Sequence, residues 1–345
     1  MGWKQDQAGR IYQGRENNIG LLRMIAALLV ILGHAYNITT GDVDPLSRLT
    51  DGQTTLGQVA VLLFFFYGGF LIMKSMESKR TARKFFRARA FRIFPLLWIV
   101  VLASVLLLGP LMTTWPKLQY FGNPGTWKYL LNGFLIPVHP LPGVFENNTL
   151  NSTVNGSLWT LPVEFICYIL CFVFYKLGLS DRKKALWTIP FAAAGAAAGW
   201  FVLIGNTVLQ SAVLPVLMFY TGMMCYLFRD RIPINGIYAI VAAGLLVVSF
   251  ILRIYPATVC ILYAYMLMYV GFGTNRKAMR FGRKYELSYA MYLTAYPIQQ
   301  ILNSLAPTMT PIVNFLISAA AVILISFPLT MIERMISKSM RLTGT

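Results

Sequence analysis

Residues 19–39 read IGLLRMIAALLVILGHAYNIT, an apolar run in which Arg23 and His34 are the only basic side chains. An α-helix needs about 20 apolar residues to cross the hydrocarbon core of a bilayer, and this run has that length. Similar runs recur along the chain, whose 345 residues are 57% hydrophobic and 12% charged. Soluble domains carry about twice that charged fraction. The composition therefore excludes a soluble enzyme, a secreted disulfide scaffold and a disordered chain, and it predicts an all-α integral membrane protein.

Ten apolar segments are candidate membrane spans. They cover about 19–39, 56–76, 92–112, 157–177, 186–204, 209–228, 235–252, 256–274, 286–304 and 311–332. With a cytoplasmic N-terminus, all but four of the 30 lysines and arginines fall in cytoplasmic segments, as is usual for membrane proteins. The four exceptions are Arg48, Lys117, Lys128 and Arg253. The sequence therefore predicts a polytopic bundle of about ten transmembrane helices with both termini in the cytoplasm.

The N-terminal segment carries Lys4, Arg10 and Arg15 ahead of the first apolar run, as a signal peptide would. The run is too long for a signal peptide, lacks a small-residue cleavage site and is followed by further spans, so we expect a retained first helix. Residues 1–345 are expected to form a single membrane domain, with no appended soluble domain.

The net charge of +18 would suggest nucleic-acid binding in a soluble protein. Here the basic residues are spread over six separate cytoplasmic segments, so we expect no nucleic-acid partner. The four cysteines lie in apolar segments, with no CxxC pair and no neighbouring histidine, and no metal site is expected. There is also no Walker loop or dinucleotide-binding glycine pattern, so ATP and NAD are unsupported.

Residues 113–156 form a long loop between the third and fourth spans, which the charge distribution places outside. Loops of this length are usually functional or disordered. Its aromatic side chains favour a packed lid or a re-entrant segment, and aromatic rings also stack on sugars; an interfacial aromatic belt explains them equally well. These aromatic residues are Trp115, Tyr120, Phe121, Trp127, Tyr129 and Phe134.

His34 and Glu164 are ionisable residues within apolar spans, where such groups usually face a cavity or a partner. Counted inward from the outer ends of their spans, His34 lies about 8 Å deep and Glu164 about 10 Å deep. This shared depth would suit a histidine base oriented by a carboxylate, or a proton-relay pair. The alternative for His34 is a hydrogen bond between helices that only supports packing. His139, in the outer loop, is expected to be a surface residue.

Three arginines are candidate site residues, and Arg23 and His34 could line one channel from opposite ends. Arg23 precedes His34 by 11 residues, which places both on one face of the helix about 16 Å apart. Arg89 and Arg92 lie in the arginine-rich entry to the third span, where arginine can bind phosphate in a bidentate manner. A cytoplasmic phosphorylated ligand, such as a nucleotide-bearing acyl donor, would fit Arg89 and Arg92. Anchoring of Arg23 at the headgroups, and lipid contact by the other two arginines, are the alternatives.

The ninth span carries a stripe of tyrosines on one helical face, which usually indicates packing but could line a polar cavity. The stripe consists of Tyr285, Tyr289, Tyr292 and Tyr296.

Four stretches of the sequence closely resemble motifs of the membrane-bound acyltransferase-3 family, the O-acyltransferases of bacterial surface glycans. The interval from Arg23 to His34 is similar to the family's Arg-x10-His signature, and residues 89–95, RAFRIFP, to its Arg-x-x-Arg-Ile-x-Pro motif. Residues 157–165, SLWTLPVEF, resemble its Ser-Leu-Trp-x-x-x-x-Glu motif, and residues 287–294, LSYAMYLT, its late-helix motif. The likeness extends over nearly the whole chain.

The resemblance implies that an acyl group, usually acetyl, passes from cytoplasmic acyl-CoA through the helix bundle to a hydroxyl of an exported or lipid-linked polysaccharide. It implies that His34 is a general base or a transient acyl carrier and that Glu164 is its orienting or proton-accepting partner. Arg23, Arg89 and Arg92 would help to bind the CoA phosphates. The implied location is the inner (plasma) membrane, among membrane lipids, with no permanently bound cofactor.

Two positions depart from the family pattern. Ala88 stands where many members have a further arginine, and Ala295 stands where many have a second histidine. The second departure concentrates proton transfer on His34. Some members are also fused to an outer esterase-like domain, whereas this chain ends at Thr345. We therefore expect either direct delivery to the acceptor or a separate partner, such as a polysaccharide-assembly protein or a second transferase.

A transporter that moves an acyl group or a lipid-linked glycan without forming a bond is the alternative function. Transporters commonly show two related halves with broken helices at the midplane, and the sequence has no such internal repeat. A purely structural membrane partner would leave His34 and Glu164 unexplained.

Overall fold

The computed structural model describes residues 17–79, 81–150, 152–202, 207–272 and 286–342. These residues are folded into helices and their connections, and their β-structure is limited to an isolated bridge between Thr113 and Val144. The N-terminal Lys4, Arg10 and Arg15 and the first tyrosine of the stripe, Tyr285, lie outside the described residues.

A helix occupies each apolar range that the sequence predicts as a span. The long helices are α2 (Ile19–Thr40), α4 (Leu56–Lys79), α5 (Ala82–Ala103), α9 (Thr160–Lys176), α10 (Arg182–Val202), α11 (Thr207–Leu227), α12 (Gly236–Ile251), α13 (Tyr255–Phe272), α15 (Ser288–Leu305) and α16 (Pro311–Leu342). Among the described residues, six helical segments are long and apolar enough to cross a membrane. They are Ile19–Thr40, Leu56–Ser78, Ala82–Met112, Gly156–Lys176, Tyr255–Phe272 and Pro311–Ile336.

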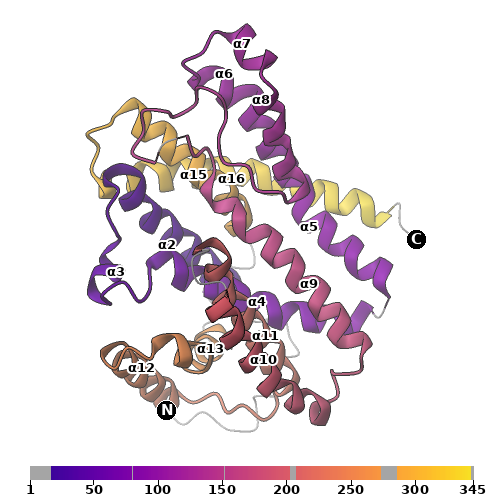
Figure 1. Cartoon of the computed structure of the whole chain (residues 1–345). Helices are drawn as coiled ribbons and strands as arrows, with labels where there is room; N and C mark the ends of the chain where they lie inside the picture. The colour runs from indigo at the N-terminus through magenta and orange to yellow at the C-terminus, as the bar shows by residue number, and fades with distance from the viewer. Residues whose placement is uncertain (1–16, 80, 151, 203–206, 273–285, 343–345) are drawn as a thin grey trace.

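Short elements complete the chain, most of them in the long outer loop. They are α3 (Pro45–Leu49), the π-helix η2 (Ser104–Leu108), α6 (Gly109–Met112), α7 (Lys117–Gly122), α8 (Pro124–Lys128), and the 3-10 helices η3 (Tyr129–Phe134) and η4 (Gly156–Trp159). In Figure 1 the helices α6, α7 and α8 stand at one end of the molecule, while α10, α12 and α13 lie at the other.

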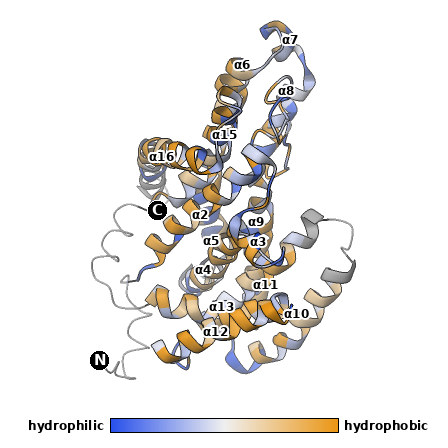
Figure 2. Cartoon of the chain, turned by 90° about the vertical axis from the view of Figure 1, so that its left-hand side faces the viewer, coloured by the Kyte–Doolittle hydropathy of each residue, from blue (hydrophilic) through white to orange (hydrophobic). Residues whose placement is uncertain are grey.

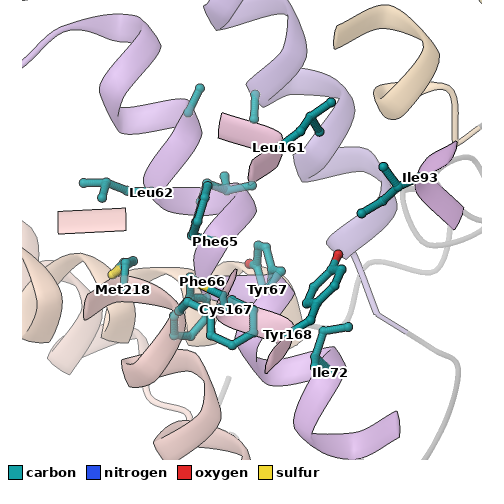
Figure 3. Packing of buried hydrophobic residues seen from close by; sticks show 14 of the residues in the cluster. Leu62, Phe65, Phe66, Tyr67, Ile72, Ile93, Leu161, Cys167, Tyr168 and Met218 are labelled. Carbon is teal, nitrogen blue, oxygen red and sulfur yellow. The ribbon is translucent and has the colours of Figure 1, made fainter. Parts of the chain in front are cut away.

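Helix α4 lies at the centre of the bundle, where it packs against α2, α5, α9 and α11. Its contact with α11 is close because each helix presents a glycine to the other backbone. A Cβ atom added at Gly69 would lie 1.9 Å from the carbonyl oxygen of Phe219, and one at Gly222 would lie 2.1 Å from that of Phe66. Small residues at helix contacts are typical of membrane proteins, where close van der Waals packing drives association. Figure 3 shows Phe66 of α4, Cys167 of α9 and Met218 of α11 in this core.

A second, smaller core joins α2 to α15 and α16, and Ile31, Met291 and Val322 are buried in it. Much of the surface remains apolar: Ile240 of α12 and Leu324 of α16 are each 74% exposed. Figure 2 shows hydrophobic residues along the outside of α10, α12 and α16. A soluble monomer rarely exposes such extensive apolar surface, so this surface is suited to lipid.

The outer loop is folded onto the bundle. The Tyr120 hydroxyl donates to the carbonyl of Val105 in η2, and both Tyr120 and Tyr129 are buried. Its last residues are held on α15, because the Asn148 amide donates to the Gln300 carbonyl and the Asn155 amide to that of Leu293. The packed-lid interpretation therefore agrees with the structure for the two tyrosines, while Trp127 and Phe134 of the same loop are exposed.

Candidate functional site

A polar cavity lies inside the apolar bundle, between α2, α4, α5, α9 and α15. Figure 3 shows part of its wall, including Phe65 and Tyr67 of α4, Leu161 and Tyr168 of α9, and Ile93 of α5. Its polar lining comprises Arg23, Tyr67, Arg89, Arg92, Thr160, Glu164, Tyr168, Ser288, Tyr289 and Tyr292. Four of the five site residues expected from the sequence, Glu164 and the three arginines, therefore line one cavity.

Two of the three arginines are held by carboxylates. Arg23 Nη1 donates to Glu286 Oε1 at 2.6 Å, and Arg92 Nη2 lies 3.5 Å from the same oxygen. Arg92 Nη1 also donates to Glu333 Oε1 of α16 at 2.5 Å. The charges of Arg23 and Arg92 compensate the charge of the partly buried Glu286 carboxylate. The carboxylates fix the two guanidinium groups at the cavity.

Arg89 differs from its neighbours. It lies three residues before Arg92 on α5, which puts both side chains on the same side of the helix. Its Nε is buried and has no hydrogen-bond partner among the described residues. A buried charged group normally has partners that offset the loss of hydration, and a donor left without one is costly. The Arg89 side chain therefore offers an unused donor at the cavity, where an anionic ligand could accept from it.

Glu164 also lines the cavity, one turn of α9 before Tyr168. Its Oε1 accepts a short hydrogen bond from the Tyr168 hydroxyl. Arg89 and Glu164 share the cavity, so a carboxylate and a guanidinium are available there for charge compensation.

His34 lies away from these groups, toward the outer loop. Its Nε2 is 3.5 Å from Oγ of Ser157, and its ring meets the Tyr296 ring edge-on at a centroid distance of 5.1 Å. The described residues contain no hydrogen bond or ion pair between His34 and Glu164. Ser157 precedes Glu164 by seven residues, which is about 10 Å along a helix. A direct contact between His34 and Glu164, one of the arrangements that their similar depth would suit, is therefore not seen in the described residues.

Tyr292 of α15 connects the two regions. Its hydroxyl donates to the Ser157 carbonyl at 2.6 Å and lies 2.6 Å from the Thr160 hydroxyl, and both Tyr292 and Thr160 line the cavity. Ser157 therefore contacts His34 through its hydroxyl and Tyr292 of the cavity wall through its carbonyl. The described part of the tyrosine stripe belongs to the site: Tyr289 and Tyr292 line the cavity and Tyr296 contacts His34.

The sequence interpretation did not single out Ser157 as a partner of His34, nor Glu286 and Glu333 as partners of the arginines. Ser157 was visible as the first residue of a recognised motif. Glu286 and Glu333 stand at the edges of the ninth and tenth apolar segments, where an acid is rare in this basic chain and could have indicated an arginine partner. Their partners are 263 and 241 residues away in sequence, so the pairing itself required the fold.

The described residues thus form a helical bundle with membrane-length apolar helices, an ionisable cavity inside it and a histidine at one end of that cavity. A family model described as an acyltransferase domain matches residues 16–331, so the chain belongs to the acyltransferase-3 family. It is therefore an acyltransferase enzyme, and not the bond-free transporter that the sequence alone left open.

The chain is similar to an O-acetyl transferase of Shigella phage Sf6, with 25% identity over 338 residues that cover 90% of this chain and 93% of the relative. It is 29% identical over 199 residues to nodulation protein 10 of Rhizobium leguminosarum bv. viciae, covering 53% of this chain and 50% of that protein. It is also 30% identical over 178 residues to acyltransferase MdmB of Streptomyces mycarofaciens, covering 51% and 43%. No solved structure matches. The family and these relatives support a membrane O-acyltransferase.

Proposed function

We propose that the enzyme transfers an acetyl group from cytoplasmic acetyl-CoA to a hydroxyl of an exported or lipid-linked polysaccharide. The observation that carries this proposal is the cavity with three arginines, which Tyr292 and Ser157 connect to His34. The similarity to a phage O-acetyl transferase over most of both chains supports the choice of acetyl. The expected location is the inner (plasma) membrane, with ten spans and both termini in the cytoplasm.

The donor would bind at the arginine end of the cavity. The cavity encloses about 100 Å³ of space, room for a thioester group or several water molecules but not for a nucleotide. The phosphates of CoA would therefore lie toward the mouth, with Arg89 as their first donor because its Nε is unpartnered. Arg23 and Arg92, which are already paired with carboxylates, would supply charge and hold the site open.

His34 would act at the acceptor end. As general base, Nε2 takes the proton from the acceptor hydroxyl while its oxygen attacks the thioester carbonyl carbon. The C–S bond breaks, an ester forms, and the CoA thiolate takes up a proton. In the alternative role of transient acyl carrier, Nε2 attacks the carbonyl carbon and the CoA thiolate leaves. The acceptor oxygen then attacks the acyl group on Nε2, and the released imidazole takes up the hydroxyl proton.

Glu164 would serve as the proton-accepting partner from the donor side of the cavity and not by direct contact with His34, because the hydrogen bonds of Tyr292 and Thr160 end on the Ser157 carbonyl, which only accepts. Its place in the cavity beside Arg89 and Tyr168 supports a role on the donor side of the reaction. A separate polysaccharide-assembly protein or second transferase stays a possible partner in our proposal.

Purified protein in lipid nanodiscs tests the proposal directly. Acetyl-CoA labelled in its acetyl group is mixed with the host's own surface polysaccharide after mild alkaline removal of its esters. We expect base-labile label on the glycan and release of one free CoA thiol per ester formed. Thiol release without labelled glycan would contradict the acceptor assignment, and the absence of both thiol release and labelled glycan would contradict group transfer.

A further inference from the structure

The outer loop lines a second cavity, which is open to the surface and separate from the one between the helices. It has a volume of about 510 Å³, within the usual range for small-molecule sites. Its walls come from three parts of the loop that are well separated in sequence, near residues 115, 123–128 and 137–152. The lining includes Trp115, Asn123, Lys128, His139, Glu146 and Ser152.

The loop backbone is organised around Trp115. Gly143 has a φ of +71°, and a Cβ there would lie 2.6 Å from Cδ1 of the Trp115 ring, so the ring packs directly on this glycine. The Trp115 backbone N–H donates to Thr113 Oγ1, and the Thr113 hydroxyl donates to the Pro142 carbonyl. These contacts fix an aromatic ring in the wall of the cavity.

The chemistry of the lining suits a sugar. Trp115 and Pro140 provide flat apolar surfaces, while Lys128 and Asn123 offer donors and Glu146 offers acceptors. A sugar ring needs both, because its C–H faces are apolar and its hydroxyls donate and accept. The formal charges of Lys128 and Glu146 cancel, in contrast to the arginine-lined cavity, so the lining shows no bias toward a nucleotide.

One short segment of the chain joins the outer-loop cavity to the hydrogen-bond partner of His34. Ser152 lines the cavity, and Ser157, the partner of His34, lies five residues further along. Five residues span at most about 18 Å, a distance that a chain of a few sugars can bridge. The segment is held in place, because the Val154 N–H donates to the His139 carbonyl and the Asn155 amide donates to the Leu293 carbonyl. Just before it, the Thr149 hydroxyl donates to the Thr39 carbonyl near the end of α2.

We propose that the outer-loop cavity is an acceptor subsite, which binds a sugar of the glycan a few units from the one that is acylated near His34. This inference rests on the proposed function and deepens it: the acceptor is an oligosaccharide, recognised away from the reacting hydroxyl, with Trp115 as its main contact.

The test compares wild type with Trp115→Ala and Trp115→Phe in nanodiscs, using the de-esterified oligosaccharide of the host's own surface glycan as the probe. Loss of the indole contact should raise the acceptor KM roughly 2- to 10-fold with kcat little changed, and the phenylalanine variant should recover part of the loss. Trp187→Ala is the matched control, because Trp187 lies on α10, is 77% exposed and lines neither cavity. A monosaccharide acceptor, too short to reach both places, should show no difference between wild type and Trp115→Ala.

Should Trp115→Ala fail to fold, His139→Ala and Lys128→Ala take its place, because both side chains are exposed at the cavity rim. Either should raise the acceptor KM. An unchanged KM in a folded variant of Trp115, or in both rim variants, would overturn the inference and leave the proposed function intact.

Saturation-transfer NMR with the same oligosaccharide and no donor separates the two proposals. Binding by wild type that Trp115→Ala weakens would support the subsite even if no acyl transfer were seen, and only the proposed function would then have failed. Binding that is equal in both proteins would overturn the subsite. A wild type that neither binds nor acylates the oligosaccharide would overturn both.

Discussion

The ion pair between Arg23 and Glu286 links the first helix of the site to the start of α15, over 263 residues of sequence. Both side chains are less than one third exposed, at 22% and 31%, so water screens the pair only in part. The Glu286 oxygen is shared with Arg92, so the carboxylate orients two of the arginines that we assign to the donor.

A double-mutant cycle on this pair should show favourable coupling. With Arg23→Gln, Glu286→Gln and the double variant, we expect a coupling of about 1–2 kcal/mol in the free energy of unfolding in detergent. A coupling that is absent would contradict the ion pair.

Arg89 is the arginine whose substitution should act most directly on the donor. We expect Arg89→Ala to lower kcat/KM for acetyl-CoA by roughly 10- to 100-fold, since hydrogen bonds to charged groups are worth about 1.5–3 kcal/mol. With S-acetylpantetheine, which has no phosphate, the variant should lose little. Arg83→Ala, on an exposed part of the same helix, is the control. An equal loss with both donors would argue against phosphate binding by Arg89.

Ser157 should matter less than His34, because its hydroxyl lies 3.5 Å from Nε2 and only orients the ring. Ser157→Ala should lower kcat roughly 2- to 10-fold, as expected for one modest hydrogen bond. Steady-state kinetics of acyl transfer at saturating donor measure the effect. A loss as large as that of His34→Ala would instead make Ser157 a direct participant.

At the scale of elements, the contact between α4 and α11 positions the cavity, since α4 carries part of its wall and Phe219 of α11 another part. The contact depends on Gly69 and Gly222, where no side chain fits. The apolar composition predicted both helices, but not their contact, because a glycine in an apolar segment does not indicate which helix it faces.

Gly222→Ala should therefore push the two helices apart. We expect a loss of about 1–3 kcal/mol in stability, the usual cost of overpacking, seen as a lower Tm in detergent. Gly244→Ala is the matched control, because an added Cβ there meets no atom within 4 Å and alanine is the better helix former. Equal Tm values for the two variants would contradict the close packing of α4 and α11.

At the scale of the whole molecule, the apolar runs predicted where the helices lie, because hydrophobic length alone marks a membrane helix, and the topology drawn from the charges stays a prediction. The motifs around Arg23, Arg89 and Glu164 indicated residues that do line one cavity. The sequence could not predict how His34 and Glu164 lie relative to each other, because the depth of a residue in the bundle depends on the tilt of its helix and on how far that helix extends. The roles of Glu286 and Glu333 were also missed, since their arginine partners are remote in sequence.

The proposed topology places the outer loop and the α9–α10 connection on opposite sides of the membrane. A cysteine at Asn147, which is exposed, should react with an impermeant maleimide in intact spheroplasts. A cysteine at Lys183, also exposed, should react only after the membrane is permeabilised. The protein without an added cysteine gives the baseline for the four native cysteines. Labelling of both sites in intact spheroplasts would contradict the arrangement.

The most direct test of the account compares surface glycans from a deletion strain that carries either the wild-type protein or His34→Ala. NMR of the glycan measures base-labile O-acyl groups, and an immunoblot measures the protein. We predict that the ester signal falls by at least about 100-fold with His34→Ala at an unchanged protein level, as expected for loss of a general base. Unchanged esters at a normal protein level would contradict an acyltransferase centred on His34.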